Sequence, residues 1–276
     1  MVINSNMSSL FASRQNGINE TALQKSMEKL SSGLRINHAA DDASGLAVSE
    51  KFRSQIRGLG QAGKNIQNGI SFINTAEGYM NETTDILQRI RELSVQSANG
   101  VYSDEDRNMI QTEVSSLIGE VDRIANSAQF NGYNMLTGRF AEDGLRFQVG
   151  ANMDQMVEVK VNRMDSEALG LTGQGNSISV ESTDSANSAI GVIDEALKTV
   201  NRNRSDLGAM QNRMEMAAKG NAIAMENMTS SESRIRDTEY AEQIVEFTKN
   251  SVLTNSSVAM LSQANSNAAN VLALLK

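Results

Sequence analysis

The residues with the most potential for chemistry are His38, the only histidine of the chain, and the nearby carboxylates Asp41 and Asp42. An imidazole beside two carboxylates could bind a metal ion or form an acid and base pair. A protein metal site needs three or more ligands, however, and the chain has no second histidine and no cysteine. The simpler interpretation is that Asp41 or Asp42 accepts hydrogen bonds from the free N–H groups of a helix that begins near Ala43.

Other catalytic patterns are missing from the sequence. It has no phosphate-binding P-loop, no dinucleotide-type glycine fingerprint and no Gly-x-Ser-x-Gly elbow. A Ser, His and Asp triad would have to use His38, and nothing places a nucleophile beside that residue. We therefore expect a protein that is not an enzyme and that uses neither a cofactor nor a metal ion.

The composition favours long helices packed side by side. The chain of 276 residues has no Pro, Cys or Trp and only 7 Phe and 4 Tyr. Helices run uninterrupted where Pro is absent, and the shortage of aromatic residues argues against a core centred on aromatic rings. The formal net charge of -8 argues against a nucleic-acid partner, because nucleic-acid binding normally needs a basic surface.

The carboxyl-terminal segment 251–275 contains no charged residue. Its eleven Ser, Thr, Asn and Gln residues make it too polar to span a membrane, so we expect no membrane insertion. A helix of this composition is expected to be buried, either among helices of other chains or in the core of its own chain. The amino terminus lacks the basic and apolar regions of a Sec-type signal peptide, which leaves a cytoplasmic protein or one exported with its start intact.

Apolar residues recur at alternating steps of three and four over most of the chain, the spacing of helices with an apolar face. One helix is expected before residue 35 and a second, with two apolar seams, after residue 43. A third helix is expected to start at the N-cap Ser103, after a stop at Asn99-Gly100. Helix returns from near 184 towards 229, and a last helix follows. The helices of the two chain ends can then pair as antiparallel coiled coils.

The pattern changes between about 129 and 183, where Gly is frequent and apolar residues alternate with a period of two. Leu145 and Phe147 share one side of an expected strand, and Val157 and Val159 share one side of a second. The turn-rich sequence "GANMDQM" separates them. These features predict a β-hairpin.

Several long motifs resemble those of bacterial flagellins. They are "EKLSSGLRINHAADDASGLAVSEKFRSQIRGLGQA", "NGISFINTAEGYMNETTDILQRIRELSVQSANG", "SRIRDTEYAEQIVEFTKN" and the final "NVLALLK". The stretch "YSDEDRNMIQTEVSSLIGEVDRIANSAQFNGYNMLTGRF" is most similar to the core flagellins of spirochaetes, whose filaments lie in the periplasm. The motifs cover most of both helical regions and are highly specific.

The resemblance implies a mainly α fold, with long antiparallel coiled-coil helices from both chain ends and a small β-hairpin insert. Residues 1–42 and 237–276 would form an inner coiled-coil domain. Residues 43–236 would form an outer-shell helical domain with a β insert near 139–183. Only about fifty residues separate the two helical halves, so the variable outer domain of many flagellins is not expected.

The implied function is that of a self-assembling structural subunit of the flagellar filament, which serves cell motility. The implied partners are other copies in a helical homopolymer, sibling flagellins or sheath proteins, a flagellar export chaperone on 240–276 and an innate Toll-like receptor. The implied location is the flagellar filament, reached by the flagellar type III route. The filament would be periplasmic in a spirochaete and extracellular otherwise.

The resemblance also assigns residues. The receptor contacts of the family carry over to Arg89, Leu93 and Glu113. The polymerisation seams are expected at Leu23, Met27, Leu30, Leu34, Ile244, Phe247, Val258, Leu261, Leu272 and Leu275. Two alternatives remain, a hook–filament junction protein, which shares terminal helices with flagellin, and a secreted coiled-coil effector or adhesin.

Overall fold

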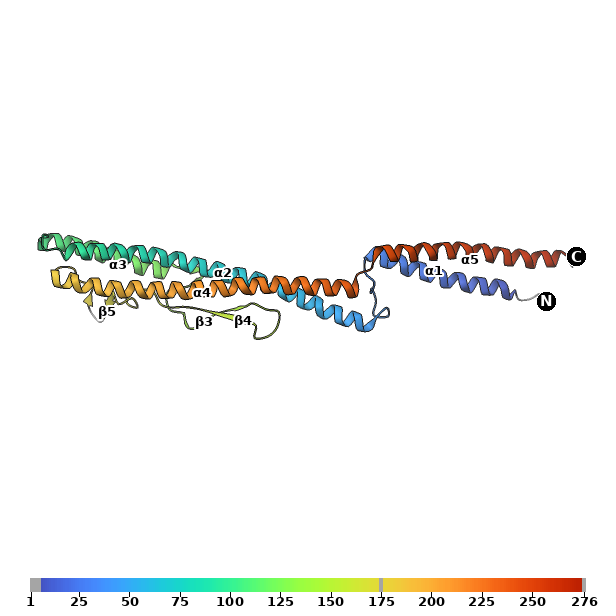
Figure 1. Cartoon of the computed structure of the whole chain (residues 1–276), viewed down its shortest axis with the longest axis horizontal. Coiled ribbons are helices and arrows are strands. Elements are labelled where there is room, and N and C mark those ends of the chain that lie inside the picture. The colour runs from blue at the N-terminus through green and yellow to red at the C-terminus, as the bar shows by residue number, and fades with distance from the viewer. Residues whose placement is uncertain (1–5, 174–175, 275–276) are drawn as a thin grey trace. The chain divides into compact units, whose positions relative to one another are not determined.

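The computed structural model describes residues 6–173 and 176–274, and this part of the chain is mostly helical, as the sequence predicts. Strands are confined to the connection between the third and fourth helices (Figure 1). The helices are α1 (Met7–Ser32), α2 (Ala43–Ser97), α3 (Asp104–Ser127), α4 (Thr183–Arg236) and α5 (Tyr240–Leu274).

The chain divides into two compact units. The terminal unit comprises the described residues up to Gln55 and from Glu226 onward, and the central unit comprises Ile56–Met225. Helices α2 and α4 contribute to both units, because the boundaries fall inside them. The division at 42/43 and 236/237 that the flagellin resemblance implies stays a prediction.

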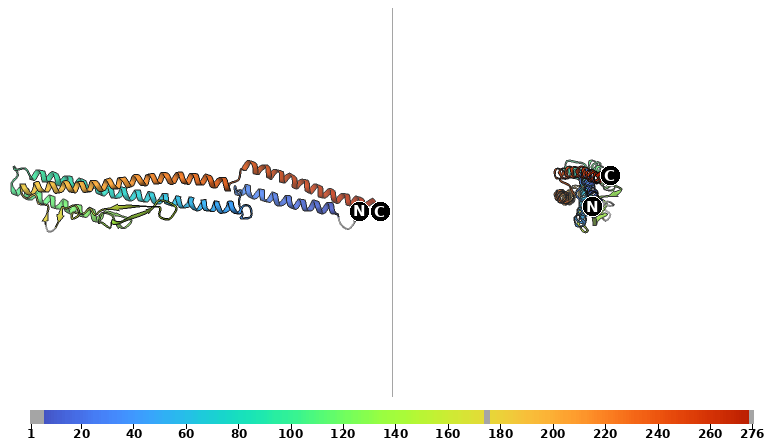
Figure 2. Two further views of the ribbon diagram at one scale, coloured as in Figure 1. Left: turned by 60° about the horizontal axis from the view of Figure 1, so that its bottom comes forward. Right: turned by 90° about the vertical axis from the view of Figure 1, so that its right-hand side faces the viewer.

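The core of the central unit lies between α2, α3 and α4, which run side by side (Figures 1 and 2). The two apolar seams predicted for α2 are both buried, because α3 and α4 cover the helix from different sides. Ile193, Val200, Leu207 and Met214, which are spaced by seven along α4, pack in the same core as the α2 seams. The fully buried members of these seams include Ile66, Phe72, Ile73, Met80, Leu87, Ile90, Val114, Val121, Ile193, Val200 and Met214.

The predicted hairpin is confirmed. Strand β3 (Phe140–Gln148) pairs antiparallel with β4 (Met156–Val161), with Leu145 opposite Val159 and Phe147 opposite Val157. The valines of β4 are buried in the core of the central unit. The tip is held from both sides: the Asn65 side chain on α2 donates to the Gln148 carbonyl at 3.2 Å, and Asn221 on α4 donates to the Val149 carbonyl.

Two shorter strand pairs were not predicted. Strand β1 (Gln129–Phe130) pairs with β2 (Tyr133–Asn134), and β5 (Thr172–Gly173) pairs with β6 (Asn176–Ser177). The β1–β2 turn is Asn131-Gly132, with φ values of 49° and 78°. Asn-Gly favours tight hairpin turns because both residues tolerate positive φ, so the sequence did carry a signal for this turn.

The expectation of a core without an aromatic centre is wrong in one place. The Phe72 ring lies 5.6 Å from the Phe130 ring and 6.0 Å from the rings of Phe140 and Phe147. Four of the 7 phenylalanines therefore gather on the hairpin side of α2. Edge-to-face contacts of this kind add stability beyond the area they bury.

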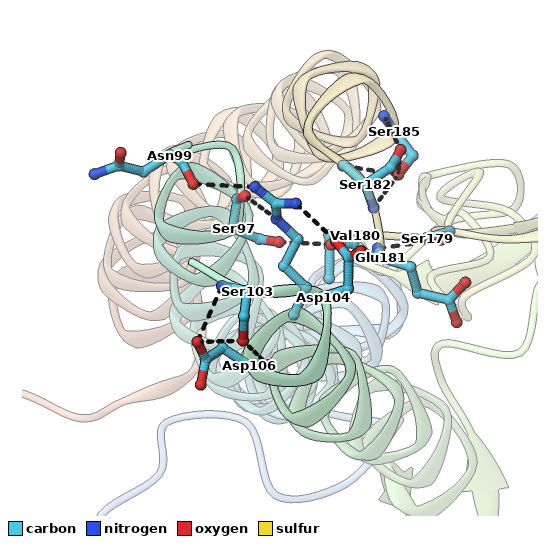
Figure 3. Close-up of polar contacts among 11 residues, drawn as sticks. Ser97, Asn99, Ser103, Asp104, Asp106, Ser179, Val180, Glu181, Ser182 and Ser185 are labelled. Carbon is cyan, nitrogen blue, oxygen red and sulfur yellow. Dashed lines mark hydrogen bonds and ion pairs between the residues drawn. The ribbon is translucent and has the colours of Figure 1, made fainter. Parts of the chain in front are cut away.

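The α2–α3 connection is fastened by polar contacts (Figure 3). Ser103 caps α3 as predicted, and the Asp106 carboxylate accepts from the Ser103 N–H in return, which completes a capping box. The buried Arg107 donates to the carbonyl of Ser97, the last residue of α2, and to the carbonyl of Asn99 in the connection. The Ser97 hydroxyl donates to the Val180 carbonyl and so ties this connection to the segment before α4.

Candidate functional site

The residues around His38 lead into the start of helix α2. Asp42 Oδ1 accepts from the Gly45 N–H at 2.9 Å, so Asp42 caps α2 as the sequence predicts. Asp41 Oδ2 accepts from the His38 N–H at 3.0 Å and thereby closes the preceding turn. The His38 imidazole lies 2.7 Å from the Glu28 carboxylate on α1. Among the described residues, no three His, Cys, Asp or Glu side chains are grouped as a metal site would need.

The cap makes the start of α2 sensitive to acid. The hydrogen bond from the Gly45 N–H lowers the pKa of Asp42 below its ordinary value of 3.8. A lowered pKa stabilises the folded state above the ordinary value, and that stabilisation is lost as pH falls through the lowered pKa. We expect Asp42→Asn to lower the melting temperature of the protein at pH 7. The difference should begin to shrink as pH falls below about 3.8 and should vanish only below the lowered pKa of Asp42. Circular dichroism at both pH values checks this, and a constant difference would contradict it.

A small clasp joins the two connections of the terminal unit. Leu34 and Asp237 form an isolated antiparallel bridge, in which the Arg35 N–H donates to the Arg236 carbonyl at 2.7 Å. The Arg236 guanidinium, which is largely buried, lies 2.6 Å from the Glu50 carboxylate. The clasp links the end of α4 to the start of α2.

Helices α1 and α5 form the long pair of the terminal unit, as the pairing of the two chain ends predicts (Figures 1 and 2). The side chains buried between them are polar. Asn19 donates to the Ser257 hydroxyl at 2.7 Å, and Asn250 donates to the Ser26 hydroxyl at 3.2 Å. These two bonds, which we call the polar seam, occupy positions where a coiled coil normally places apolar residues.

The large apolar residues of α1 and α5 lie mainly on the outside of the pair. We call this set the apolar face. Exposed apolar residues in this number indicate interaction sites, because exposed apolar area is costly unless a partner covers it. The set comprises Met7, Leu10, Phe11, Ile18, Met27, Ile244, Val245, Val252, Leu253, Val258 and Met260.

A groove of about 580 Å³ runs along this face between α1 and α5. Phe11 and Leu253 line it, with side chains 59% and 42% exposed. A concave apolar surface of this size can receive a helix that carries apolar residues of its own.

The predicted seam residues divide into two groups. Leu23, Leu30, Phe247 and Leu261 are half-buried on α1 and α5, and Leu34 is half-buried in the clasp. Met27, Ile244 and Val258 are exposed and belong to the apolar face. Leu272 lies on α5, and Leu275 lies outside the described residues.

The residues predicted for receptor contact lie in the central unit. Arg89 on α2 and Glu113 on α3 are joined by an ion pair of 2.8 Å, and both side chains are about half exposed. The hydrogen bond that the Arg89 guanidinium donates to the Glu113 carboxylate raises the pKa of Arg89. Leu93 is only 2% exposed and packs in the core beneath them. The structure therefore brings Arg89 and Glu113 together on the surface, with Leu93 underneath.

Sequence reasoning missed two parts of the site. It did not assign Leu10, Phe11, Ile18 or Val252 to any surface, although their apolar character was visible in the sequence. It also did not foresee the polar seam, whose signal is the recurrence of Asn and Ser at helical spacing in α1 and α5. No helix in the described part of the chain is long and apolar enough to cross a membrane.

The chain is similar to known proteins over its whole length. Family models described as the bacterial flagellin N-terminal and C-terminal helical regions match residues 3–141 and 190–275. The chain is 62% identical to the flagellar filament 30.7 kDa core protein of Treponema maltophilum and 56% identical to flagellin FlaB1 of Treponema pallidum, each alignment covering 100% of both chains. A crystal structure of Bacillus cereus flagellin matches with a TM-score of 0.50 and 24% identity, covering 57% of this chain and 88% of the other.

Proposed function

The chain belongs to the bacterial flagellin family and is a structural subunit of the flagellar filament, not an enzyme. We propose that it assembles with other copies through the apolar face of α1 and α5. The observation that carries this proposal is the reversed pair: polar side chains lie between the two helices, and Phe11, Leu253 and their apolar neighbours lie outside.

Burial of the apolar face supplies the free energy of assembly. Covering one large apolar side chain contributes about 1.5–3 kcal/mol, so a few such residues per contact suffice for stable addition. Contacts between unlike surfaces of successive copies generate a helical filament when the rotation from one copy to the next does not close a ring. Under this proposal the inner coiled-coil domain comprises 1–42 and 237–276, and 43–236 form the outer shell.

Seeded extension tests the proposed assembly. Purified chains are added to short filament seeds, and electron microscopy measures filament length against time. A filament subunit lengthens the seeds continuously. A hook–filament junction protein would bind seed ends without lengthening them, and a secreted effector or adhesin would do neither.

We propose that the β3–β4 hairpin helps to set the supercoil of the filament. This proposal is supported by two hydrogen bonds: Asn65 attaches the hairpin tip to α2, and Asn221 attaches it to α4. A displacement of either helix would therefore shift the tip. Deleting the turn 150–156 is expected to change the supercoil of filaments that still assemble, as seen by electron microscopy. An unchanged supercoil would refute this role.

We propose export by the flagellar type III route, with an export chaperone on 240–276 and a periplasmic filament. The similarity to Treponema filament core proteins supports the location. The exposed apolar residues of α5 support a chaperone that covers them before assembly. Deleting 240–276 should abolish co-purification of the chaperone, and thin sections of the source cell should place the filaments in the periplasm. Sibling flagellins or sheath proteins should co-purify with those filaments.

We propose that an innate Toll-like receptor contacts the Arg89 and Glu113 surface of free subunits. Both side chains are accessible and paired, whereas Leu93 supports them from the core. Arg89→Glu should weaken receptor binding about tenfold or more, because it places two carboxylates together and removes the cation. The double variant Arg89→Glu, Glu113→Arg restores the ion pair with its two charges exchanged. It does not restore the arrangement of the cation and the carboxylate that the receptor contacts. Surface plasmon resonance distinguishes the cases, and full binding by Arg89→Glu would exclude this contact.

A further inference from the structure

Two methionines line the groove of the apolar face. Met7 at the start of α1 and Met260 on α5 are 68% and 63% exposed, and both lie beside Phe11 and Leu253. The chain has 15 methionines and no cysteine, so the methionine thioethers are its most readily oxidised groups. Several others are protected in the core, among them Met80, Met135, Met164 and Met214.

We propose that Met7 and Met260 are redox-sensitive modification sites, and that their oxidation by a peroxide prevents addition of the subunit to the filament. The proposal rests on the proposed function, because it requires the apolar face to be covered in the filament. It adds a chemical control that neither the fold nor the family membership implies.

The reaction is a two-electron oxygen transfer. A lone pair of the thioether sulfur attacks one oxygen of hydrogen peroxide, the S–O bond forms and the O–O bond breaks. Proton transfer to the departing oxygen gives water, so each methionine and one peroxide yield one methionine sulfoxide and one water. Methionine sulfoxide reductases supplied with a dithiol return the sulfoxide to the thioether: the oxygen leaves as water and the dithiol is oxidised to a disulfide, so the modification is reversible.

Oxidation at these two positions is expected to hinder addition of the subunit because of where the thioethers lie. In the free chain both sulfurs are open to water, so a peroxide can reach them and a sulfoxide there remains hydrated. In the filament, apolar side chains of another copy would replace that water. A strongly polar sulfoxide oxygen is costly to bury without a hydrogen-bond donor. The oxidised subunit is therefore expected to fold normally and to add poorly.

The test treats free chains with hydrogen peroxide, maps the oxidised methionines by mass spectrometry and measures seeded extension. The critical concentration for extension should rise by roughly tenfold, and methionine sulfoxide reductases should restore it. In assembled filaments, Met7 and Met260 should resist the same treatment. Normal extension by chains oxidised at both positions would overturn the proposal.

The double variant Met7→Leu and Met260→Leu assigns the effect to these positions. Leucine keeps the apolar volume and cannot be oxidised in this way, so the variant should lose much less of its extension after peroxide than the original chain. A small residual loss is expected, because Met27 on the apolar face is also exposed and can still be oxidised. Met109→Leu, at a methionine that is also exposed but lies on α3, should remain as sensitive as the original chain. If the double variant loses extension after peroxide as the original chain does, the proposal is wrong. If the double variant extends poorly before treatment, each single variant should show partial resistance. Failure of untreated original chains to extend seeds would instead contradict the proposed assembly.

Discussion

Replacing Phe11 and Leu253 together with aspartate is expected to abolish seeded extension. The two side chains line the groove of the apolar face from opposite helices. Each substitution removes about 1.5–3 kcal/mol of apolar burial and places a charge where another copy would exclude water, which adds a further cost. Electron microscopy and sedimentation of seeded samples measure the loss.

The control for this variant is Val101→Asp. Val101 is an apolar residue of the α2–α3 connection, is 86% exposed, and lies outside the apolar face. The same chemical change at this position should leave extension intact. Circular dichroism should show a normal helical content for the central unit in both variants. If the Phe11 and Leu253 variant extended seeds at the original rate, the assembly surface would have to lie elsewhere on the subunit.

Phe72→Ala is expected to lower the free energy of unfolding of the central unit by about 3–5 kcal/mol. Phe72 is 1% exposed and contacts three other phenylalanine rings, so the substitution leaves a cavity that α2 and the hairpin cannot close. A loss of this size is a large share of the 5–15 kcal/mol that is typical for a domain. Urea unfolding followed by circular dichroism measures it.

Phe72→Leu serves as the matched comparison. It keeps most of the buried volume and loses the ring contacts, so its cost should be clearly smaller than that of Phe72→Ala. Equal costs for the two variants would show that ring contacts, rather than filled volume, stabilise this part of the core.

The periodicity of the sequence predicted the helices because their packing is local and repetitive. Ile66, Ile73 and Met80 recur every seven residues, and this spacing alone places them on one buried side of α2. The start of α3 was equally predictable, since a cap such as Ser103 acts within four residues of itself. Alternation at Leu145 and Phe147 identified the hairpin for the same reason.

Periodicity could not decide which side of α1 and α5 faces the partner helix. A pattern search takes apolar residues such as Met27 and Ile244 as the inner side of a pair, yet both are exposed. The inner positions belong to Asn19 and Asn250, whose amides are paired across the seam. A filament subunit must reserve apolar area for other copies, and the sequence of one chain does not distinguish inner apolar residues from outer ones.

The aromatic cluster also could not be predicted from the sequence pattern, because its rings come from segments far apart in the chain. Phe72 lies on α2, Phe130 on β1 and Phe147 on β3. Only the folded central unit brings the rings of Phe130 and Phe147 within 6.0 Å of the Phe72 ring. The count of aromatic residues is low in the whole chain, but it says nothing about their local concentration.

The polar seam has a consequence for the regularity of the filament. Apolar coiled-coil residues tolerate a slip by one turn, because one methyl group replaces another. The paired amides and hydroxyls of the seam do not, since a slip of about 5.4 Å would part both bonds and leave buried polar groups without partners. Helices α1 and α5 are thus fixed in one register relative to each other. The seam therefore keeps the exposed apolar residues of α1 and α5 in the same relative positions in every copy, which a regular filament requires.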